Sequence, residues 1–382
     1  MPDRAPQAAD RYDVVVAGGG PAGTAAALTL ARAGRSVLLA NAGGGPPKVG
    51  EALPSAARTL LHDLGVGEQP VVEGHLTCYA NLSAWGSATL GRVDFIRDPN
   101  GPGWHLDRAR FDRRLREAAR TAGAALADHT AIRPHRRTPD GGWAVTLHSR
   151  QSTRLVRCLW LIDASGRRRA IAARCGATRQ TTDRLLATCL ELPPAPTAPH
   201  TETSSLVEST PDGWWYTALL PTGRRLVAYF TDADLTPPPL HDRAALPQLL
   251  RQTRYVAARA DAHPVPTDAT PRRAPAHSSH LDTATGDGWI AVGDAAAAFD
   301  PISSQGILTA LYTGMTGAGA LNTHLDGDTT ALDSYRDNVN GLLAAYQRNH
   351  HTAYALERRW AQRPFWQRRH KTLPPPTGME CA

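Results

Sequence analysis

The sequence predicts an α/β fold, in which an open α/β domain is interrupted by an antiparallel β-rich insertion and followed by a helical tail. Three observations support this prediction. A strand, a glycine turn, a helix and a second strand succeed one another in residues 12–40. Short β-type runs between proline-rich connectors occupy the middle of the chain, and a strand, a loop and a long helix follow in residues 286–321. With 382 residues the chain can form one large domain or two intertwined ones.

The N-terminal βαβ unit is the most regular part of this pattern. Val14–Val16 are an apolar run of the kind found in buried strands, and Ala25–Ala33 contains strong helix formers. Gly34 suits the C-terminal cap of that helix, and Val37–Ala40 provide the second strand. The unit is therefore typical of a Rossmann-like domain.

Later segments continue the same domain. We expect a helix in residues 51–65, with Pro54 near its start and Gly65 at its end. Residues 107–124 show the apolar stripe of an amphipathic helix. Two runs, residues 142–149 and 153–166, then have the apolar character of strands.

The insertion has a different composition. Three proline-rich connectors bracket β-type runs in residues 204–209, 213–220 and 224–232. From Leu342 onward the sequence predicts a helix. We therefore expect three parts. They are a nucleotide-binding domain (residues 1–75, 100–183 and 277–340), a substrate domain (76–99 and 184–276) and a helical, basic and aromatic tail (341–382).

Composition and charge restrict the class of protein. Hydrophobic residues make up 42% and charged residues 20%, which is typical of a globular chain. The net charge is +7, but the chain has two lysines, Lys48 and Lys371, and its basic residues match no nucleic-acid-binding module. No apolar run is long enough to span a membrane, and five scattered cysteines indicate neither zinc nor a disulfide framework. We expect a cytoplasmic protein that binds neither nucleic acid nor membrane.

The glycine turn carries the first chemical prediction. Gly18, Gly20 and Gly23 form a G-x-G-x-x-G pattern between strand and helix, where glycines allow a pyrophosphate to approach the helix N-terminus. In such sites an acidic residue after the second strand, about 20 residues on, binds the ribose hydroxyls. Asn41 occupies that place here, and its amide can still form a hydrogen bond with a hydroxyl.

Three further segments resemble FAD-dependent monooxygenases of the p-hydroxybenzoate hydroxylase type and the flavin-dependent halogenases that share their fold. They are GWHLDRARFDRRL, LIDASGR and GWIAVGDAAAAFDPISSQGI, in the same order as in that superfamily. The resemblance implies that Arg108 contacts the phosphates or ribose of FAD, that Asp294 binds the ribityl chain and that Pro301–Ile307 line the isoalloxazine. The full set of implied cofactor-binding residues is Gly18, Gly20, Ala22, Gly23, Asn41, Glu51, Arg108, Asp163, Gly166, Gly293, Asp294, Pro301, Gln305, Gly306 and Ile307.

The chain departs from the tryptophan halogenases at three places. Their essential lysine corresponds to a position near Thr77, and their glutamate corresponds to Ser303. Their W-x-W-x-I-P motif is replaced by GWWYTALLP, residues 213–221. We therefore do not expect halogenation by the known route.

The resemblance is closer to the LodB-like and QhpG-like flavoproteins, which oxygenate tryptophan side chains within partner proteins. It rests on residues 49–61, 79–87, 103–108, 213–221 and 356–370, and similar segments occur in flavoproteins of natural-product pathways. The resemblance implies a monooxygenase in which reduced FAD and O₂ form a C4a-hydroperoxide that an electron-rich aromatic ring attacks. Electrons would come from NAD(P)H or from a separate flavin reductase.

Candidate catalytic residues lie in the β-rich insertion, whose segments should cover the flavin. They are Tyr79, Asn81, Trp85, Trp215 and Tyr216, and the aromatic ones equally suit the core of a sheet. His105 could act as a base or have a structural role, so we name no catalytic acid or base. The tail places aromatic residues among arginines, which suits docking of an acidic peptide, protein or carrier protein, but also packing of the tail on the domain.

Other functions remain open at this point. A flavin-dependent reductase or dehydrogenase on this fold would need no oxygen. A divergent halogenase and a flavin-binding protein without activity of its own are further alternatives.

Overall fold

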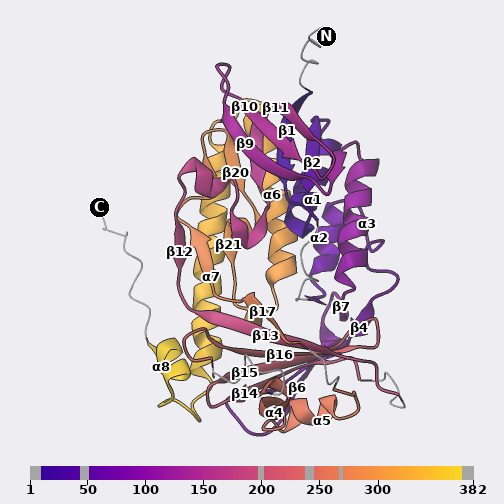
Figure 1. Cartoon of the computed structure of the whole chain (residues 1–382), viewed down its shortest axis with the longest axis vertical. Coiled ribbons are helices and arrows are strands. Elements are labelled where there is room, and N and C mark those ends of the chain that lie inside the picture. The colour runs from indigo at the N-terminus through magenta and orange to yellow at the C-terminus, as the bar shows by residue number, and fades with distance from the viewer. Residues whose placement is uncertain (1–9, 44–50, 197–201, 237–244, 266–269, 372–382) are drawn as a thin grey trace. The chain divides into compact units, whose positions relative to one another are not determined.

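The structure is a computed structural model that describes residues 10–43, 51–196, 202–236, 245–265 and 270–371 (Figure 1). Its chain divides into two compact units. Unit 1 comprises Met1–Cys78, Phe95–Asp183 and His277–Ala344, and unit 2 comprises Tyr79–Asp94, Arg184–Ala276 and Ala345–Ala382. Each unit is thus built from segments that are distant in the sequence.

Unit 1 contains an eight-stranded mixed sheet. Its central strands are parallel, in the order β20-β11-β1-β2-β8. The apolar run predicted as the first strand is completely buried in β1, as expected for a strand covered on both faces. Strands β9, β10 and β19 extend the sheet by antiparallel pairing. The bounds are β1 Arg11–Ala17, β2 Val37–Asn41, β8 Ala125–Asp128, β9 Ala131–Arg137, β10 Trp143–His148, β11 Thr153–Asp163, β19 Thr285–Gly286 and β20 Trp289–Ala291.

Helix α1 packs directly against α6. A side chain at Gly314 of α6 would place its Cβ 2.2 Å from the carbonyl oxygen of Ala22, so glycine is what allows this contact. Helix α3 lies on the other flank of α1, and Asp107 caps its N-terminus by accepting a hydrogen bond from the Arg110 amide. The helices that begin in unit 1 are α1 Pro21–Arg32, α2 Ala57–Asp63, α3 Arg108–Thr121, α6 Gly306–Leu325 and α7 Ala331–Ala355.

Several helix boundaries differ from the prediction. Helix α1 begins at Pro21 rather than Ala25, because proline is well suited to the first helical position. Helix α2 is confined to Ala57–Asp63, since the residues before it form the short strand β3. The helix expected from Leu342 begins at Ala331 and continues as α7 into unit 2.

Two small sheets complete unit 1. One has the order β3-β7-β4 and the other β12-β18-β21, and all their pairings are antiparallel. They place the segments that follow β2 and β20 beside the main sheet. Their strands are β3 Ala52–Leu53, β4 Leu76–Cys78, β7 Gly103–His105, β12 Arg179–Thr181, β18 Ser279–Leu281 and β21 Ala297–Ala298.

Unit 2 is organised around a seven-stranded sheet in the order β17-β13-β16-β15-β14-β5-β6. We expected this sheet to be antiparallel, and five of its six strand pairings follow that pattern. The pairing of β5 with β14 is parallel, because β5 enters from a much earlier part of the chain. The strands are β5 Ala80–Ala84, β6 Gly91–Asp94, β13 Leu185–Leu192, β14 Ser205–Thr210, β15 Gly213–Leu219, β16 Arg225–Asp232 and β17 Arg272–Pro275.

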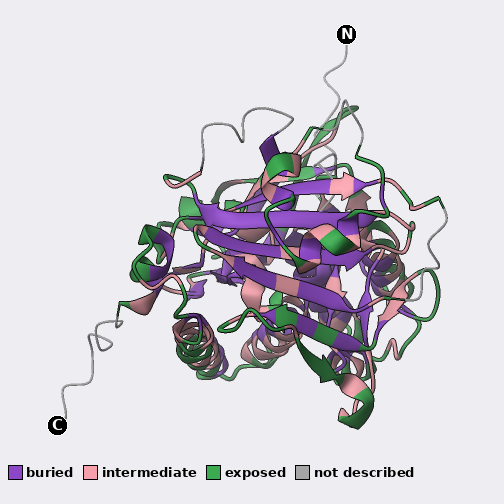
Figure 2. Ribbon diagram, turned by 90° about the horizontal axis from the view of Figure 1, so that it is seen from below, coloured by how far each residue is buried: buried purple, intermediate pink, exposed green. Residues whose placement is uncertain are grey.

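The two faces of this sheet carry different partners. Helices α4 (Ala245–Leu250) and α5 (Tyr255–Ala260) pack on the face that includes Trp215 and Val227. Trp214 points to the opposite face, as the alternation along a strand requires, and there it donates a hydrogen bond to the Tyr354 hydroxyl at 3.0 Å. The central strands are therefore covered on both sides, and Figure 2 shows them mostly in the colour of buried residues.

Candidate functional site

The glycine turn between β1 and α1 is closed to any larger residue. Gly18 adopts a φ of +122°, and a Cβ there would lie 2.2 Å from the carbonyl oxygen of Ala164. A Cβ at Gly23 would lie 1.9 Å from the carbonyl oxygen of Gly18. Gly20 is the N-cap of α1, and no side chain caps this helix. The first amide groups of α1 are therefore available to an anionic group, which the positive end of the helix dipole also favours.

The second predicted segment contacts this turn through its loop. Asp163 ends β11 and is completely buried. Its carboxylate accepts hydrogen bonds from the amides of Ser165, Ile171 and Ala172 at 2.8–3.0 Å and from the Ser165 hydroxyl at 2.6 Å. These bonds saturate the carboxylate with protein donors. Asp163 therefore positions the loop that contains Gly166, and its direct contact with the cofactor stays a prediction.

The third predicted segment lies against the start of α1. Gly293 has a φ of +59°, and a Cβ there would lie 2.7 Å from the Cβ of Ala22. The next residue, Asp294, is half exposed and forms an ion pair with Arg167, with 3.7 Å between Oδ2 and Nε. Three sequence segments that are far apart thus meet at the N-terminus of α1.

The turn before α6 contains the remaining predicted residues of this unit. Asp300 is fully buried and caps the turn Pro301–Ser303 by accepting a hydrogen bond from the Ile302 amide at 2.9 Å. Gln305 and Gly306 are exposed at the beginning of α6, whereas Ile307 is buried. No side chain caps α6, so its N-terminal amides offer a second electropositive end.

Two predicted cofactor residues have mainly intramolecular contacts. Arg108 is the first residue of α3 and pairs with Asp112 at 3.3 Å, with both side chains largely buried. Glu51 is buried, and its carbonyl oxygen accepts a hydrogen bond from the Leu106 amide. His105 is fully buried in the central strand of a three-stranded sheet, which favours a structural role over that of a base.

Two polar residues near the glycine turn were missed by the sequence analysis. Arg116 of α3 donates a hydrogen bond to the carbonyl oxygen of Gly19 at 2.9 Å, and Asp128 accepts one from the Asn41 side chain at 3.1 Å. Neither belongs to a recognisable motif. The position of Asp128 at the end of an apolar strand was the one available signal.

Arg169 is a third residue that the sequence did not single out. Although it is an arginine, it is almost completely buried, and it donates hydrogen bonds to the carbonyl oxygens of Ser279 and Ala295 at 3.0 Å. Burial, reinforced by Arg179 and Arg167, lowers the pKa of Arg169 to about 10. The guanidinium joins the loop after β11 to the segment that carries Asp294.

The candidate catalytic residues in unit 2 do not form one group. Trp215 is buried beneath α4 and α5 and packs on Tyr229, as its sheet-core alternative requires, and a catalytic role for it stays a prediction. Asn81 and Tyr216 belong to the opposite face of the sheet, by the registers of β5, β14 and β15. Asn81 accepts a hydrogen bond from the Ser205 hydroxyl, and Tyr79 is 59% exposed.

Trp85 belongs to an aromatic cluster on that same face. Its indole NH donates to the carbonyl oxygen of Ala353 at 2.7 Å, and its ring meets those of Trp214, Tyr354 and Trp366 edge-on. Trp85 therefore fixes the tail to the sheet, which is the structural alternative to substrate binding.

The basic tail is used for the same purpose. Helix α8 (Pro364–His370) buries Phe365 and Trp366 completely. Arg369 is buried and pairs with Asp232 at 2.8 Å, while Arg363 pairs with Asp212 in the open. Carboxylates of the same unit thus pair with these arginines, which favours the packing alternative for the tail, while docking of an acidic partner stays a prediction. Residues 372–382 of the predicted tail lie outside the described part of the chain.

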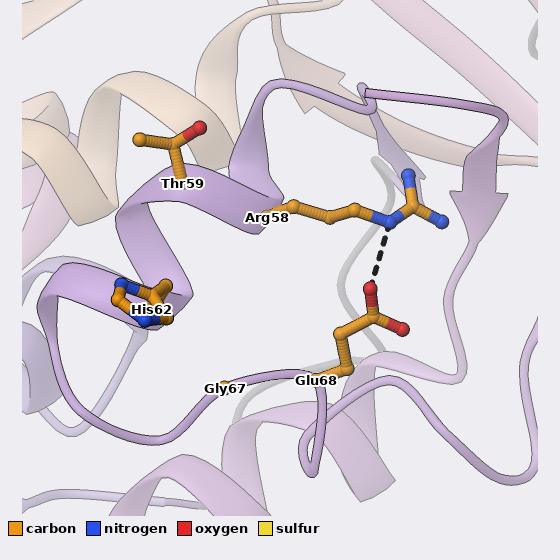
Figure 3. Close-up of a pocket in the computed structure, with 5 residues that line it drawn as sticks. All are labelled: Arg58, Thr59, His62, Gly67 and Glu68. Carbon is orange, nitrogen blue, oxygen red and sulfur yellow. Dashed lines mark hydrogen bonds and ion pairs between the residues drawn. The ribbon is translucent and has the colours of Figure 1, made fainter. Parts of the chain in front are cut away.

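A surface hollow beside α2 is distinct from these motifs. Arg58, Thr59, His62, Gly67 and Glu68 line it (Figure 3). The Arg58 guanidinium is held by Glu68 at 2.9 Å, by the carbonyl oxygen of Pro102 at 2.7 Å and by the face of Trp104. The guanidinium of Arg58 is thus fully engaged by neighbouring residues. The hollow contains none of the predicted cofactor residues.

Comparison with known proteins decides the family. The family model described as FAD binding domain matches residues 11–348. The chain belongs to this FAD-binding family. It is 30% identical over 371 residues to the FAD-dependent oxidoreductase LodB of Marinomonas mediterranea, covering 94% of this chain and 97% of LodB. The family assignment makes the chain an FAD-dependent oxidoreductase.

Solved structures agree with the family assignment. The peptidyl tryptophan dihydroxylase QhpG superposes with a TM-score of 0.77 at 26% identity, covering 94% of this chain and 78% of QhpG. The myxobacterial chondrochloren halogenase CndH superposes with a TM-score of 0.85 at 20% identity, over 95% of this chain and 86% of CndH. The second likeness shows the fold alone. The predicted superfamily and its flavin-binding α/β fold are confirmed.

The residues of this FAD-binding chain fit the cofactor. Gly18 and Gly23 keep the turn tight, because a Cβ at either would clash with a backbone carbonyl oxygen, and the uncapped N-terminus of α1 can hold a diphosphate. In the described ranges no helix is long and apolar enough to cross a membrane, and no group of three acidic, histidine or cysteine residues could hold a metal ion.

Proposed function

We propose that this FAD-dependent oxidoreductase is a monooxygenase that oxidises an electron-rich aromatic group, such as an indole or a phenol, on a peptide, protein or carrier-bound substrate. The observation that carries this proposal is the near-complete alignment with LodB, together with the likeness to QhpG, which is a peptidyl tryptophan dihydroxylase. Both relationships extend over the β-rich unit as well as the flavin-binding one.

The side chains at the halogenase positions support oxygenation rather than halogenation. The Ser303 hydroxyl donates to the carbonyl oxygen of Asp300 at 2.9 Å and accepts from the Gln305 amide at 3.3 Å, so it is engaged within its own turn. Thr77 lies in β4 opposite Trp104 and has no ammonium group. Lys371 is the one lysine within the described ranges, and it belongs to the tail; Lys48 lies outside them.

The tryptophans of the GWWYTALLP segment also have structural partners. Trp214 stacks on Phe230 with 3.9 Å between ring centroids, and Trp215 packs on Tyr229. Buried aromatic pairs of this kind stabilise a sheet by about 0.5–1.5 kcal/mol beyond their area. These two indoles therefore belong to the core of unit 2 and do not reproduce the halogenase motif.

In this proposal the chain's own residues bind and orient. The amides at the N-terminus of α1 hold the diphosphate of FAD, and Gly293 and Asp294 hold the part of the cofactor next to the diphosphate. The N-terminus of α6 provides positive potential that favours an anion nearby. Bound FAD supplies the redox chemistry, and the protein supplies position and exclusion of water. We propose O₂ as the co-substrate and NAD(P)H or a separate flavin reductase as the electron source.

The test is oxygen incorporation into matched substrates. Purified protein with FAD, a reducing system and ¹⁸O₂ is incubated with a tryptophan-containing peptide, with the same tryptophan on a carrier protein, and with free tryptophan or phenol. Bromide is included in a parallel series. We expect the tethered substrates to gain labelled oxygen, detected by mass spectrometry, and to gain no bromine.

Each other result has a definite meaning. Brominated product would favour the divergent halogenase. Reduction or desaturation without labelled oxygen would indicate the reductase or dehydrogenase. Equal turnover of free and tethered aromatics would contradict the macromolecular substrate while leaving oxygenation intact.

A further inference from the structure

Two polar side chains meet at the carboxyl ends of adjacent strands in unit 1. Asn41 is the last residue of β2 and Asp128 the last residue of β8, and the two are partners in the parallel register. The Asn41 side-chain amide donates a hydrogen bond to Oδ1 of Asp128 at 3.1 Å. Cofactor sites of open α/β sheets lie at this edge of the sheet.

The pair lies directly beside the glycine turn. A Cβ at Gly19 would be 2.7 Å from the Cβ of Asn41, so the asparagine side chain packs on the turn itself. Arg116 connects the same elements, because Nη1 donates to the carbonyl oxygen of Gly19 at 2.9 Å and Nε lies 3.8 Å from Oδ1 of Asp128. The turn, the end of β2 and the end of β8 thus form one polar cluster.

We propose that Asp128 supplies the carboxylate that binds the ribose hydroxyls of the adenosine half of FAD, with Asn41 as its second polar group. The usual acid at the end of the second strand is absent, and Asp128 brings an equivalent charge to the same edge from the neighbouring strand. This inference depends on FAD binding, which the family assignment supports, and not on the proposed monooxygenase activity.

The chemistry of the two side chains is complementary. A carboxylate has about four acceptor positions, and the Asp128 side chain is 52% exposed, so it can accept from hydroxyls while it holds Asn41. An aspartate at position 41 would place two carboxylates side by side, and such pairs cannot both ionise freely. Asparagine at 41 is therefore the residue that suits an acid at 128.

The experiment exchanges the two side chains. FAD affinity is measured by flavin fluorescence for the wild type, Asp128→Asn, Asn41→Asp and the double variant Asn41→Asp/Asp128→Asn. We expect each single variant to bind FAD about tenfold more weakly, since a hydrogen bond to a charged group is lost or two carboxylates repel. The double variant should return to within about threefold of the wild type, because it restores one carboxylate and one amide.

An analogue of FAD tests whether the ribose is the group recognised. The wild type should bind FAD with deoxygenated adenosine ribose about tenfold more weakly than FAD, and Asp128→Asn should bind both about equally. Asp140→Asn removes the same charge from an exposed turn and should leave both affinities unchanged. Thermal unfolding of each apo-protein confirms that it is folded.

Two outcomes would overturn the assignment. One is wild-type FAD affinity in Asp128→Asn. The other is an equal loss of affinity for FAD and for the deoxygenated analogue, which would reduce Asp128 to a structural support of the turn. Both readouts are binding constants, so they stand whether or not the protein proves to be a monooxygenase.

Discussion

The two units use their distinctive residues in opposite ways. In unit 1, glycines allow three distant segments to pack closely around the N-terminus of α1, where the predicted cofactor residues lie. In unit 2, tryptophans and arginines that resemble binding residues are occupied with one another, because they fasten α8 and the end of α7 to the sheet. The conspicuous residues of unit 2 therefore have protein partners, whereas the glycines of unit 1 precede a helix N-terminus that no side chain caps.

The largest expected effect comes from adding a side chain in the glycine turn between β1 and α1. In Gly23→Ala the new Cβ would meet the backbone oxygen of Gly18 at 1.9 Å, and backbone cannot move aside as a flexible side chain can. We expect FAD affinity to fall on the order of a hundredfold, which corresponds to the upper range of overpacking costs. Flavin fluorescence titration measures this loss.

A matched control is available in α6. A Cβ at Gly319 would meet no atom within 4 Å, so Gly319→Ala should keep FAD affinity and raise stability by up to about 1 kcal/mol through helix propensity. If Gly23→Ala bound FAD as well as Gly319→Ala did, the site would not depend on close backbone approach, and the contrast between the units would disappear.

The difference between the units also explains what the sequence could predict. The glycine turn, the strand before it and the helix after it are adjacent in the chain, so their pattern indicated both the fold and the cofactor. Asp128 lies 87 residues from Asn41, and only the pairing of β2 with β8 brings them together. The spacing of residues along the sequence therefore could not indicate that the Asp128 carboxylate replaces the acid usually found at the end of the second strand.

The ion pairs of the tail could not be predicted for a related reason. Its arginines have partners more than 130 residues earlier in the chain, at Asp212 and Asp232. Sequence alone shows a dense positive run and does not show the carboxylates that neutralise it. In β15 the sequence did allow Trp215 and Tyr216 to be considered as sheet core, but it did not assign each residue to a face of the sheet.

The second prediction compares two ion pairs of the tail. Arg369 and Asp232 are almost fully buried, whereas the side chains of Arg363 and Asp212 are about half exposed. Arg369→Leu removes the buried positive charge that pairs with the buried Asp232 carboxylate. We therefore expect a loss of about 3 kcal/mol in the free energy of unfolding. Arg363→Leu should cost at most about 1 kcal/mol, because solvent screens an exposed pair. Urea unfolding measures both.

A salt titration sharpens this comparison. The small contribution of Arg363 to the free energy of unfolding should decrease at high ionic strength. The contribution of Arg369 should persist, since buried ion pairs are screened much less. Losses of at most about 1 kcal/mol in both variants would mean that the aromatic residues hold the tail and that its arginines contribute little.

The smallest expected effect is a pH dependence at Glu357, which precedes the last helix. This carboxylate is completely buried and accepts hydrogen bonds from the Gly86 amide at 2.8 Å, from the Ser209 hydroxyl at 2.6 Å and from Arg359. Burial alone would raise its pKa, but the hydrogen bonds from Arg359 and Ser209 outweigh burial, and the pKa is lowered from the ordinary 4.5.

The sign of the effect follows from this lowered pKa. The folded protein holds the proton of Glu357 less tightly than the unfolded chain does, so the carboxylate stabilises the fold above pH 4.5 and loses that contribution as the pH falls through the folded value. Glu357→Gln lacks the titrating group. The difference in free energy of unfolding between the wild type and Glu357→Gln, measured with urea, should therefore decrease below pH 4.5.

Glu73→Gln changes a glutamate that is 73% exposed and should show no such trend. A difference that stayed constant with pH would show that the buried glutamate contributes through packing and hydrogen-bond geometry rather than through its charge, and that the tail of unit 2 is not fastened electrostatically at this point.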